Sequence, residues 1–240
     1  MDIGRAFGFV FEDEQWFSKL LLGAVISLIP IFGQFALIGY GITVIRNVIA
    51  GHPRPLPEWD DLGGYFMDGL MIWIAQIVYA LPLIIAACFI FTPAFLPLLA
   101  GENENLMAIL GGVSTVLIIG ASCVMGLYGL LIWLVTPMIQ VQYAVRKELG
   151  ACLRVGEIVR LTFSNIGNIL IALGMIMVVG VVFSTAISVA YGVLGVIPII
   201  GWMLMLPVGL LVLPFGVWVN VFSAYLYGQV GRASGFAQAV

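Results

Sequence analysis

Residues 166–193 of the chain read IGNILIALGMIMVVGVVFSTAISVAYGV. They lie within a longer stretch, from Arg160 to Arg232, that contains no Asp, Glu, Lys or Arg between its two ends. A helix that rises about 1.5 Å per residue crosses the hydrocarbon core of a bilayer with roughly 20 apolar residues. The run is long enough to cross, and it lacks the alternation of apolar and polar residues that marks β-barrel strands. It therefore predicts a transmembrane helix.

The rest of the chain has the same character. Of its 240 residues, 62% are hydrophobic and 9% are charged, and the mean hydropathy is +1.17. A soluble domain has about 25% charged residues, so too few charges are present to cover a water-exposed surface. Three further stretches carry no charge, between Lys19 and Arg46, Asp68 and Glu102, and Glu104 and Arg146. We expect an all-α fold, a polytopic integral membrane helical bundle that forms a single membrane domain.

The segments follow from these uncharged stretches and from the loops between them. They are an interfacial N-terminal segment (1–18), a first hairpin (20–48), a cytoplasmic proline-rich and acidic loop (49–68), spans at 69–99 and 106–143, a cytoplasmic amphipathic helix (144–165), and spans at 166–193 and 202–228.

One short pattern occurs twice. Ile-Pro-Ile-Phe-Gly at residues 29–33 and Ile-Pro-Ile-Ile-Gly at residues 197–201 each precede a long apolar run. Proline removes a helix hydrogen bond and glycine permits a tight turn, so each pattern predicts a tight connection between two helices. With a turn at the first pattern the chain has six transmembrane segments, which we expect; with a single kinked span there it has five.

The basic residues predict the orientation. The connection at 41–68 contains two Arg and that at 144–165 contains Lys and Arg, whereas those at 100–105 and 194–201 contain neither. Loops rich in Lys and Arg stay in the cytoplasm. We therefore expect a multi-pass protein of the plasma membrane whose C-terminus is cytoplasmic.

Several motifs resemble those of an uncharacterised membrane family, domain of unknown function 4013. They are Gly39-Tyr-Gly-Ile-Thr-Val-Ile-Arg-Asn-Val-Ile-Ala-Gly51, Leu56-Pro-Glu-Trp-Asp60, Asp68-Gly69, Phe11-Glu-Asp-Glu-Gln-Trp16, and Arg154-Val-Gly-Glu-Ile-Val-Arg160 ahead of Asn165. The resemblance implies a helical membrane bundle, distantly similar to the membrane domain attached to some glycerophosphodiester phosphodiesterases. It implies no established activity.

The loop at 49–68 allows two interpretations. Its alternating prolines force an extended path, and His52 with the acids that follow could form a partner-binding or metal-binding loop. A single histidine without ligand spacing argues against a metal. We favour a stiff loop in which Trp59 anchors in lipid headgroups while Arg46 or Arg54 pairs with nearby acids.

The segment at 144–165 has polar and apolar residues on opposite helix faces. Such a helix lies in the interface with Arg154 and Arg160 near anionic headgroups. An ordinary anchoring helix is the favoured interpretation, and a lipid-binding groove is the alternative. The candidate partner-contact or lipid-contact residues are Arg46, Arg54, Trp59, Arg154 and Arg160.

The residue inventory argues against several kinds of function. Proton relays and ion pathways need ionisable side chains within the membrane, and the predicted spans contain none. The single histidine lies in a loop, no glycine-rich phosphate-binding loop is present, and the net charge of -3 does not favour nucleic acid. We expect no enzyme activity, no cofactor and no metal.

The expected partners are the lipid bilayer and other membrane proteins or further copies of the chain. The leading hypothesis is a non-enzymatic accessory or scaffold subunit that packs against other membrane proteins. The alternative is a lipid-handling protein or an uncoupled small-solute transporter or channel.

Overall fold

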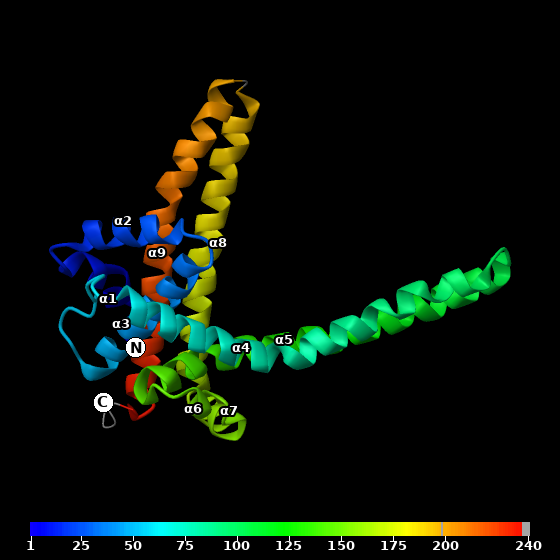
Figure 1. Cartoon of the computed structure of the whole chain (residues 1–240), viewed down its shortest axis with the longest axis horizontal. Helices are drawn as coiled ribbons and strands as arrows, with labels where there is room; N and C mark the ends of the chain where they lie inside the picture. The colour runs from blue at the N-terminus through cyan, green and yellow to red at the C-terminus, as the bar shows by residue number, and fades with distance from the viewer. Residues whose placement is uncertain (198, 237–240) are drawn as a thin grey trace. The chain divides into compact units, whose positions relative to one another are not determined.

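A computed structural model describes residues 1–197 and 199–236, apart from the side chains of Cys88, Phe89, Phe91 and Ile200 (Figure 1). The described residues form helices joined by short connections, and none of them is in a β-strand. The helices are α1 (Ile3–Gly8), η1 (Phe9–Glu12), α2 (Trp16–Ser27), α3 (Phe32–Ala50), α4 (Leu62–Phe91), η2 (Pro93–Ala100), α5 (Glu104–Arg146), α6 (Leu149–Cys152), α7 (Val155–Ser164), α8 (Ile166–Val196) and α9 (Ile200–Ala233). The predicted all-α helical bundle is confirmed.

Five described helices, α3, α4, α5, α8 and α9, are long and apolar enough to cross a membrane. The chain therefore has the helices of a multi-pass membrane protein. Helix α2 has 12 residues, or about 18 Å, which is short of the roughly 30 Å hydrocarbon core. The number of described helices long enough to cross is therefore five, as in the alternative, although the pattern at 29–33 is a turn and not the kink that the alternative assumed.

The two Ile-Pro-Ile-x-Gly patterns have the same backbone conformation where it is described. Ile31 has φ 66° and ψ −61°, and Ile199 has φ 65° and ψ −65°. The left-handed region is strained for a β-branched residue, so the surrounding turn must impose it. Two residues later, a Cβ at Gly33 would overlap the carbonyl oxygen of Ile26, and one at Gly201 would overlap that of Leu194. Both patterns are therefore tight turns in which only glycine fits.

The predicted boundaries of two segments differ from the observed ones. The span expected at 69–99 is a longer helix, α4, followed by the 3-10 helix η2. The single amphipathic helix expected at 144–165 is two helices, α6 and α7, because the chain turns at Leu153 and Arg154 between them.

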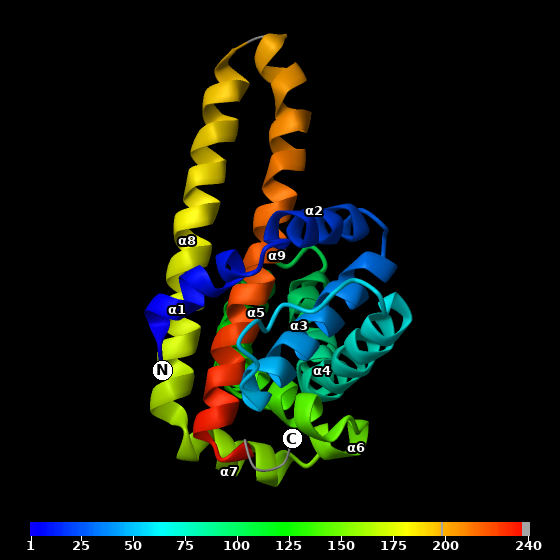
Figure 2. The same ribbon diagram turned by 90° about the vertical axis from the view of Figure 1, so that its left-hand side faces the viewer.

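The chain divides into two compact units, Met1–Ile74 with Pro137–Val240, and Ala75–Thr136. In the first unit, α8 and α9 form a hairpin whose helices lie side by side, α3 packs along α9, and α2 crosses α9 (Figure 2). A Cβ at Gly228 would lie 2.6 Å from Val48 Cβ, so this glycine lets α9 approach α3 closely. The buried core between these helices includes Tyr40, Ile45 and Phe222.

Helices α3 and α4 cross through a reciprocal pair of glycines in the first unit. A Cβ at Gly39 of α3 would overlap the backbone of Tyr65 of α4, and a Cβ at Gly69 of α4 would overlap the backbone of Phe35 of α3. Each glycine therefore receives the backbone of the other helix. Gly39 and Gly69 of the Gly39–Gly51 and Asp68-Gly69 motifs thus have a packing role, whereas Gly51 has φ 79° and ends α3.

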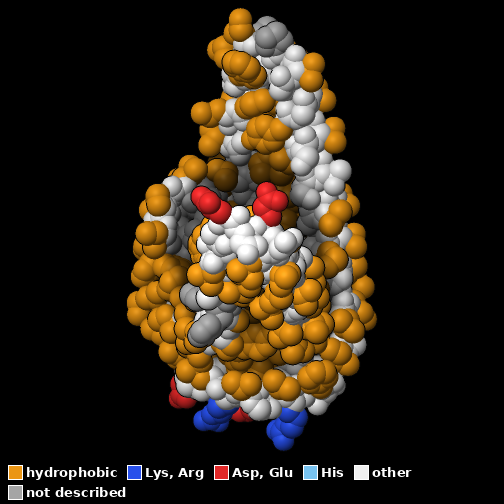
Figure 3. Space-filling model, turned by 90° about the vertical axis from the view of Figure 1, so that its right-hand side faces the viewer, with side chains coloured by type: hydrophobic (Ala, Val, Ile, Leu, Met, Phe, Trp, Pro, Cys, Tyr) orange, Lys and Arg blue, Asp and Glu red, His pale blue; other side chains and the backbone are white. Residues whose placement is uncertain are grey.

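The second unit contains the far part of α4, η2 and most of α5. Tyr128 donates a hydrogen bond to the Tyr79 carbonyl (3.1 Å), and Ser114 donates one to the Pro93 carbonyl. Asn103 caps α5, since its side chain accepts from the Leu106 N–H at 3.0 Å. Apolar side chains cover most of the molecular face in Figure 3, as expected for helices surrounded by acyl chains.

Candidate functional site

A buried lysine joins the N-terminal segment to the loop at 49–68. The Lys19 amine lies 2.8 Å from Asp13 Oδ2 and 2.8 Å from Glu58 Oε1, and it also donates to the Leu56 carbonyl. The Lys19 and Asp13 side chains are 7% and 11% exposed, whereas Glu58 is 60% exposed. The Lys19–Asp13 pair is therefore the buried part of this cluster.

Burial and ion pairing have opposite effects on the pKa values of Lys19 and Asp13. Burial disfavours the charged amine, but the hydrogen bonds that the amine donates to Asp13 and Glu58 outweigh this effect and raise the pKa of Lys19. Burial likewise disfavours the Asp13 carboxylate, but the hydrogen bonds from Lys19 and the Gln15 N–H outweigh it and lower the pKa of Asp13. The pair is thus ionised at neutral pH.

Trp59 lies against the protein. Its ring stacks on that of Tyr40 with centroids 4.1 Å apart, and its Nε1 donates to the Lys19 carbonyl at 2.9 Å. Tyr40 and Tyr65 donate to the carbonyls of Pro57 and Glu58, at 2.9 and 2.6 Å. These contacts fix the loop onto α2, α3 and α4, and the expected anchoring of Trp59 in lipid headgroups stays a prediction.

The two arginines of this region form the expected ion pairs with acids. Arg46 Nη2 lies 3.6 Å from Asp68 Oδ2, and its Nε donates to the Ala144 carbonyl at 2.9 Å. Tyr143 donates to the other oxygen of Asp68 at 2.9 Å. Arg46 therefore joins α3, α4 and α5, and its contact with lipid stays a prediction.

The second arginine is more accessible. Arg54 pairs with Glu14 at 3.1 Å, with side chains 58% and 82% exposed. Such an exposed pair contributes little to stability and can exchange its partner. His52 joins no metal-ligand cluster, because the described residues contain no group of three or more His, Cys, Asp or Glu that could hold a metal ion.

Of the remaining predicted contact residues, Arg154 precedes α7 and Arg160 lies within it. Helix α7 buries Ile158 and exposes Phe163. Arg154 is exposed and lies 3.7 Å from Glu157, which also pairs with Arg146 at 2.8 Å. Arg160 is exposed. Arg154 and Arg160 are therefore exposed, whereas Arg46 and Trp59 are half-buried, and contact of these residues with lipid stays a prediction.

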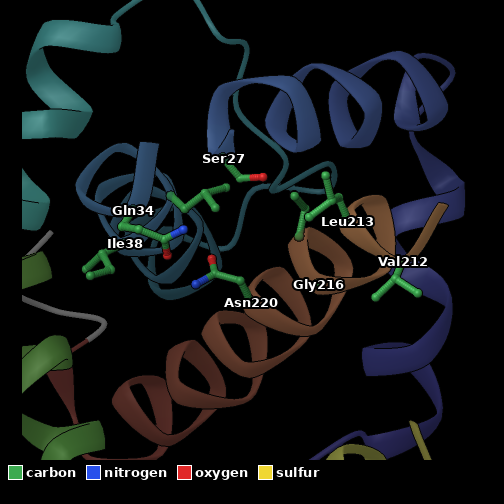
Figure 4. Close-up of a pocket in the computed structure, with 9 residues that line it drawn as sticks. Ser27, Gln34, Ile38, Val212, Leu213, Gly216 and Asn220 are labelled. Carbon is green, nitrogen blue, oxygen red and sulfur yellow. The ribbon is translucent and has the colours of Figure 1, made fainter. Parts of the chain in front are cut away.

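A pocket that the sequence did not predict lies between α2, α3 and α9, with a volume of about 300 Å³ (Figure 4). Its lining contains no charged side chain; it consists of Ser27, Gln34, Leu37, Ile38, Val212, Leu213, Gly216, Val217 and Asn220. The side chains of Gln34 and Asn220 point toward one another across it. Asn220 Oδ1 is buried and accepts no hydrogen bond from any described group.

Residues 22–192 match the family described as Protein of unknown function (DUF4013). The chain belongs to this family. No curated protein and no solved structure matches the chain. The resemblance noted in the sequence is thus confirmed, and the more distant similarity to glycerophosphodiester phosphodiesterase membrane domains stays a prediction.

The DUF4013 match covers only part of the Lys19 cluster and only part of the pocket. It includes Trp59, Glu58 and Arg46, together with the α3 wall of the pocket. Lys19, which bonds to Trp59 and Glu58, precedes the match, and the α9 wall of the pocket follows it. The DUF4013 region of this chain is therefore completed by packing against residues on both sides of it.

Proposed function

We propose that this protein is a non-enzymatic accessory or scaffold subunit that packs against other transmembrane helices through one face of α5. The supporting observation is a row of small residues at alternating intervals of four and three, the spacing of the core positions in packed helix pairs. It comprises Ala108, Gly112, Thr115, Ser122, Gly126 and Gly129, interrupted by Ile119, and we call it the small-residue row.

The glycines of this row do not pack closely against any described part of the chain. A Cβ added at Gly112, Gly126 or Gly129 would meet no heavy atom within 4 Å. By contrast, neighbouring backbone occupies the space where a Cβ would lie at Gly39 and Gly69. Since small residues in membrane helices let another helix approach closely, the open row favours a partner outside this chain.

A different face of α5 makes the contacts within the second unit. Ser114 and Tyr128 of α5 bond to carbonyls of Pro93 and Tyr79. At about 100° per residue, Ser114 and Tyr128 lie on a different face from Gly112 and Gly126. One face of α5 can thus bind its own chain while the row binds another membrane protein or a second copy.

The proposed placement has the chain in the plasma membrane with its C-terminus in the cytoplasm. Arg146 ends α5, and Lys147, Arg154 and Arg160 follow it before α8 begins. Basic residues close to helix ends favour the cytoplasmic side. This supports the same side for the loop at 49–68, since Arg46 bonds to the Ala144 carbonyl.

The test is extraction of the tagged full-length chain from its native membrane in a mild detergent, followed by native mass spectrometry. We expect a defined complex with another membrane protein or a second copy. The Gly126→Leu/Gly129→Leu variant should reduce the complex by about tenfold, equivalent to roughly 1.4 kcal/mol of lost packing. The matched control is Gly120→Leu, because Gly120 is exposed with open surroundings but lies on a different face of α5.

The proposal would be abandoned after either of two results. One is a wild-type chain that leaves the membrane as a bare monomer. The other is a complex that the row variant and the Gly120→Leu control affect equally.

A further inference from the structure

The pocket between α2, α3 and α9 has a polar end and an apolar end. Gln34 of α3 and Asn220 of α9 lie at one end, and Val212 and Leu213 lie toward the other (Figure 4). Ser27 adds a hydroxyl whose proton is donated to the Ala24 carbonyl at 2.6 Å, so its free lone pairs can only accept. The lining thus fits an amphipathic molecule.

The polar end needs a hydrogen-bond donor. Asn220 Oδ1 is a buried acceptor without a described partner, and an unsatisfied buried acceptor costs about 1–3 kcal/mol. A hydroxyl group from a bound molecule would satisfy it. Because the lining contains no Lys or Arg, it offers nothing that would neutralise a phosphate.

The two ends also differ in depth along α9. Counted from Ile200, Val212 lies about 18 Å and Asn220 about 30 Å along the helix axis. The polar and apolar ends of the pocket are thus about 12 Å apart along the axis of α9.

We propose that this pocket binds an uncharged lipid with a free hydroxyl group, of the diacylglycerol class. The hydroxyl donates to Asn220 Oδ1, the Gln34 amide donates to an ester carbonyl, and the first methylenes lie against Val212 and Leu213. A volume of about 300 Å³ accommodates the head and the start of the chains, which continue into the bilayer.

The experiment uses the purified full-length chain and a diacylglycerol that carries a photoreactive diazirine in one acyl chain. Labelling is measured by mass spectrometry, with three competitors of identical acyl chains: diacylglycerol, its 3-acetyl ester, and phosphatidic acid. We expect diacylglycerol alone to compete well, because the ester lacks the donor hydroxyl and phosphatidic acid brings a charge that the pocket does not neutralise. Equal competition by all three lipids would overturn the proposal.

Two variants locate the site. Asn220→Leu removes the acceptor and should lower labelling by about tenfold, the effect of one hydrogen bond. Gly216→Leu fills the pocket and should abolish labelling; a Cβ at Gly216 meets no atom within 4 Å, so this variant should fold. The matched control is Gly174→Leu on α8, which has equally open surroundings and should label normally.

The variants can also contradict the proposal. Labelling of Gly216→Leu at the level of wild type would show that the lipid lies elsewhere. Equal loss of labelling in Gly174→Leu and Gly216→Leu would also contradict the proposal, because it would indicate a general effect of leucine on the helices. Size-exclusion profiles establish that each variant is folded, and Gly216→Leu decides the outcome where Asn220→Leu aggregates.

Discussion

Replacing Gly39 or Gly69 by alanine is expected to destabilise the first unit by about 3 kcal/mol or more, the upper end for overpacking. The added methyl group would overlap the backbone of Tyr65 in one case and that of Phe35 in the other. A flexible side chain could move aside, but a helix backbone cannot move without separating α3 from α4. The double variant should not fold.

The measurement is unfolding of the purified variants in detergent, followed by circular dichroism as temperature or denaturant increases. Gly63→Ala is the control on the same helix, because Gly63 is exposed in α4 and a Cβ there meets nothing within 4 Å. We expect this control to match wild type. Equal midpoints for Gly39→Ala and Gly63→Ala would show that the close crossing of α3 and α4 does not exist.

Replacing Lys19 by methionine is expected to cost about 3–5 kcal/mol, the typical effect of removing one partner of a buried ion pair. Methionine keeps most of the apolar stem of lysine, so the loss reflects the charge. Asp13 would remain buried without its partner, and the loop that carries Glu58 and Leu56 would lose its attachment to α2. Unfolding midpoints and proteolysis within the 49–68 loop measure the effect.

Two further variants separate the buried pair from the exposed acid. Lys19→Met/Asp13→Asn should recover part of the loss, because no uncompensated charge remains. Glu58→Gln should cost less than about 1 kcal/mol, since the Glu58 side chain is 60% exposed. A double variant as unstable as the sum of its single variants would contradict the coupling of Lys19 with Asp13.

The Lys19–Asp13 pair also makes the stability of the fold depend on pH. Folding lowers the pKa of Asp13. The contribution of Asp13 to the stability of the fold is therefore present above about pH 4 and is lost as the pH falls through the pKa of the folded state. Folding raises the pKa of Lys19. The contribution of Lys19 to the stability of the fold is therefore present below about pH 10 and is lost as the pH rises through the pKa of the folded state. The deficit of Lys19→Met should therefore shrink under acid conditions, when the isolated Asp13 becomes protonated.

The sequence predicted those features that depend on composition and local pattern. Stretches without charge predicted the long helices, and the repeated Ile-Pro-Ile-x-Gly pattern predicted the turns at Ile31 and Ile199, whose conformations agree. The length of α2 was not predictable from hydropathy, because the residues on both sides of its turn are equally apolar.

Features that depend on tertiary contacts were harder to predict. Trp59 was placed among headgroups because tryptophan favours interfaces, yet its partner is Tyr40, a long-range contact without a sequence signal. Lys19 did carry a signal, since it is the one basic residue between an acidic cluster and an apolar run. The pocket was not predictable, because Gln34 and Asn220 come from opposite ends of the chain and meet only when α3 packs on α9.

Labelling of single cysteines in intact cells with a charged, membrane-impermeant maleimide tests the membrane arrangement most directly. Glu102→Cys and Val196→Cys represent the two tips, the connections between α4 and α5 and between α8 and α9. His52→Cys and Arg160→Cys represent the proposed cytoplasmic side, and the native Cys123, which is exposed in the structure, represents the middle of α5. Each is studied with the other cysteines replaced. We predict that the two tips react in intact cells, that positions 52 and 160 react only after the membrane is opened, and that Cys123 reacts in neither case because acyl chains cover it. Rapid labelling of Cys123, or of a tip and position 52 from the same side, would contradict a chain that crosses the bilayer as helical hairpins.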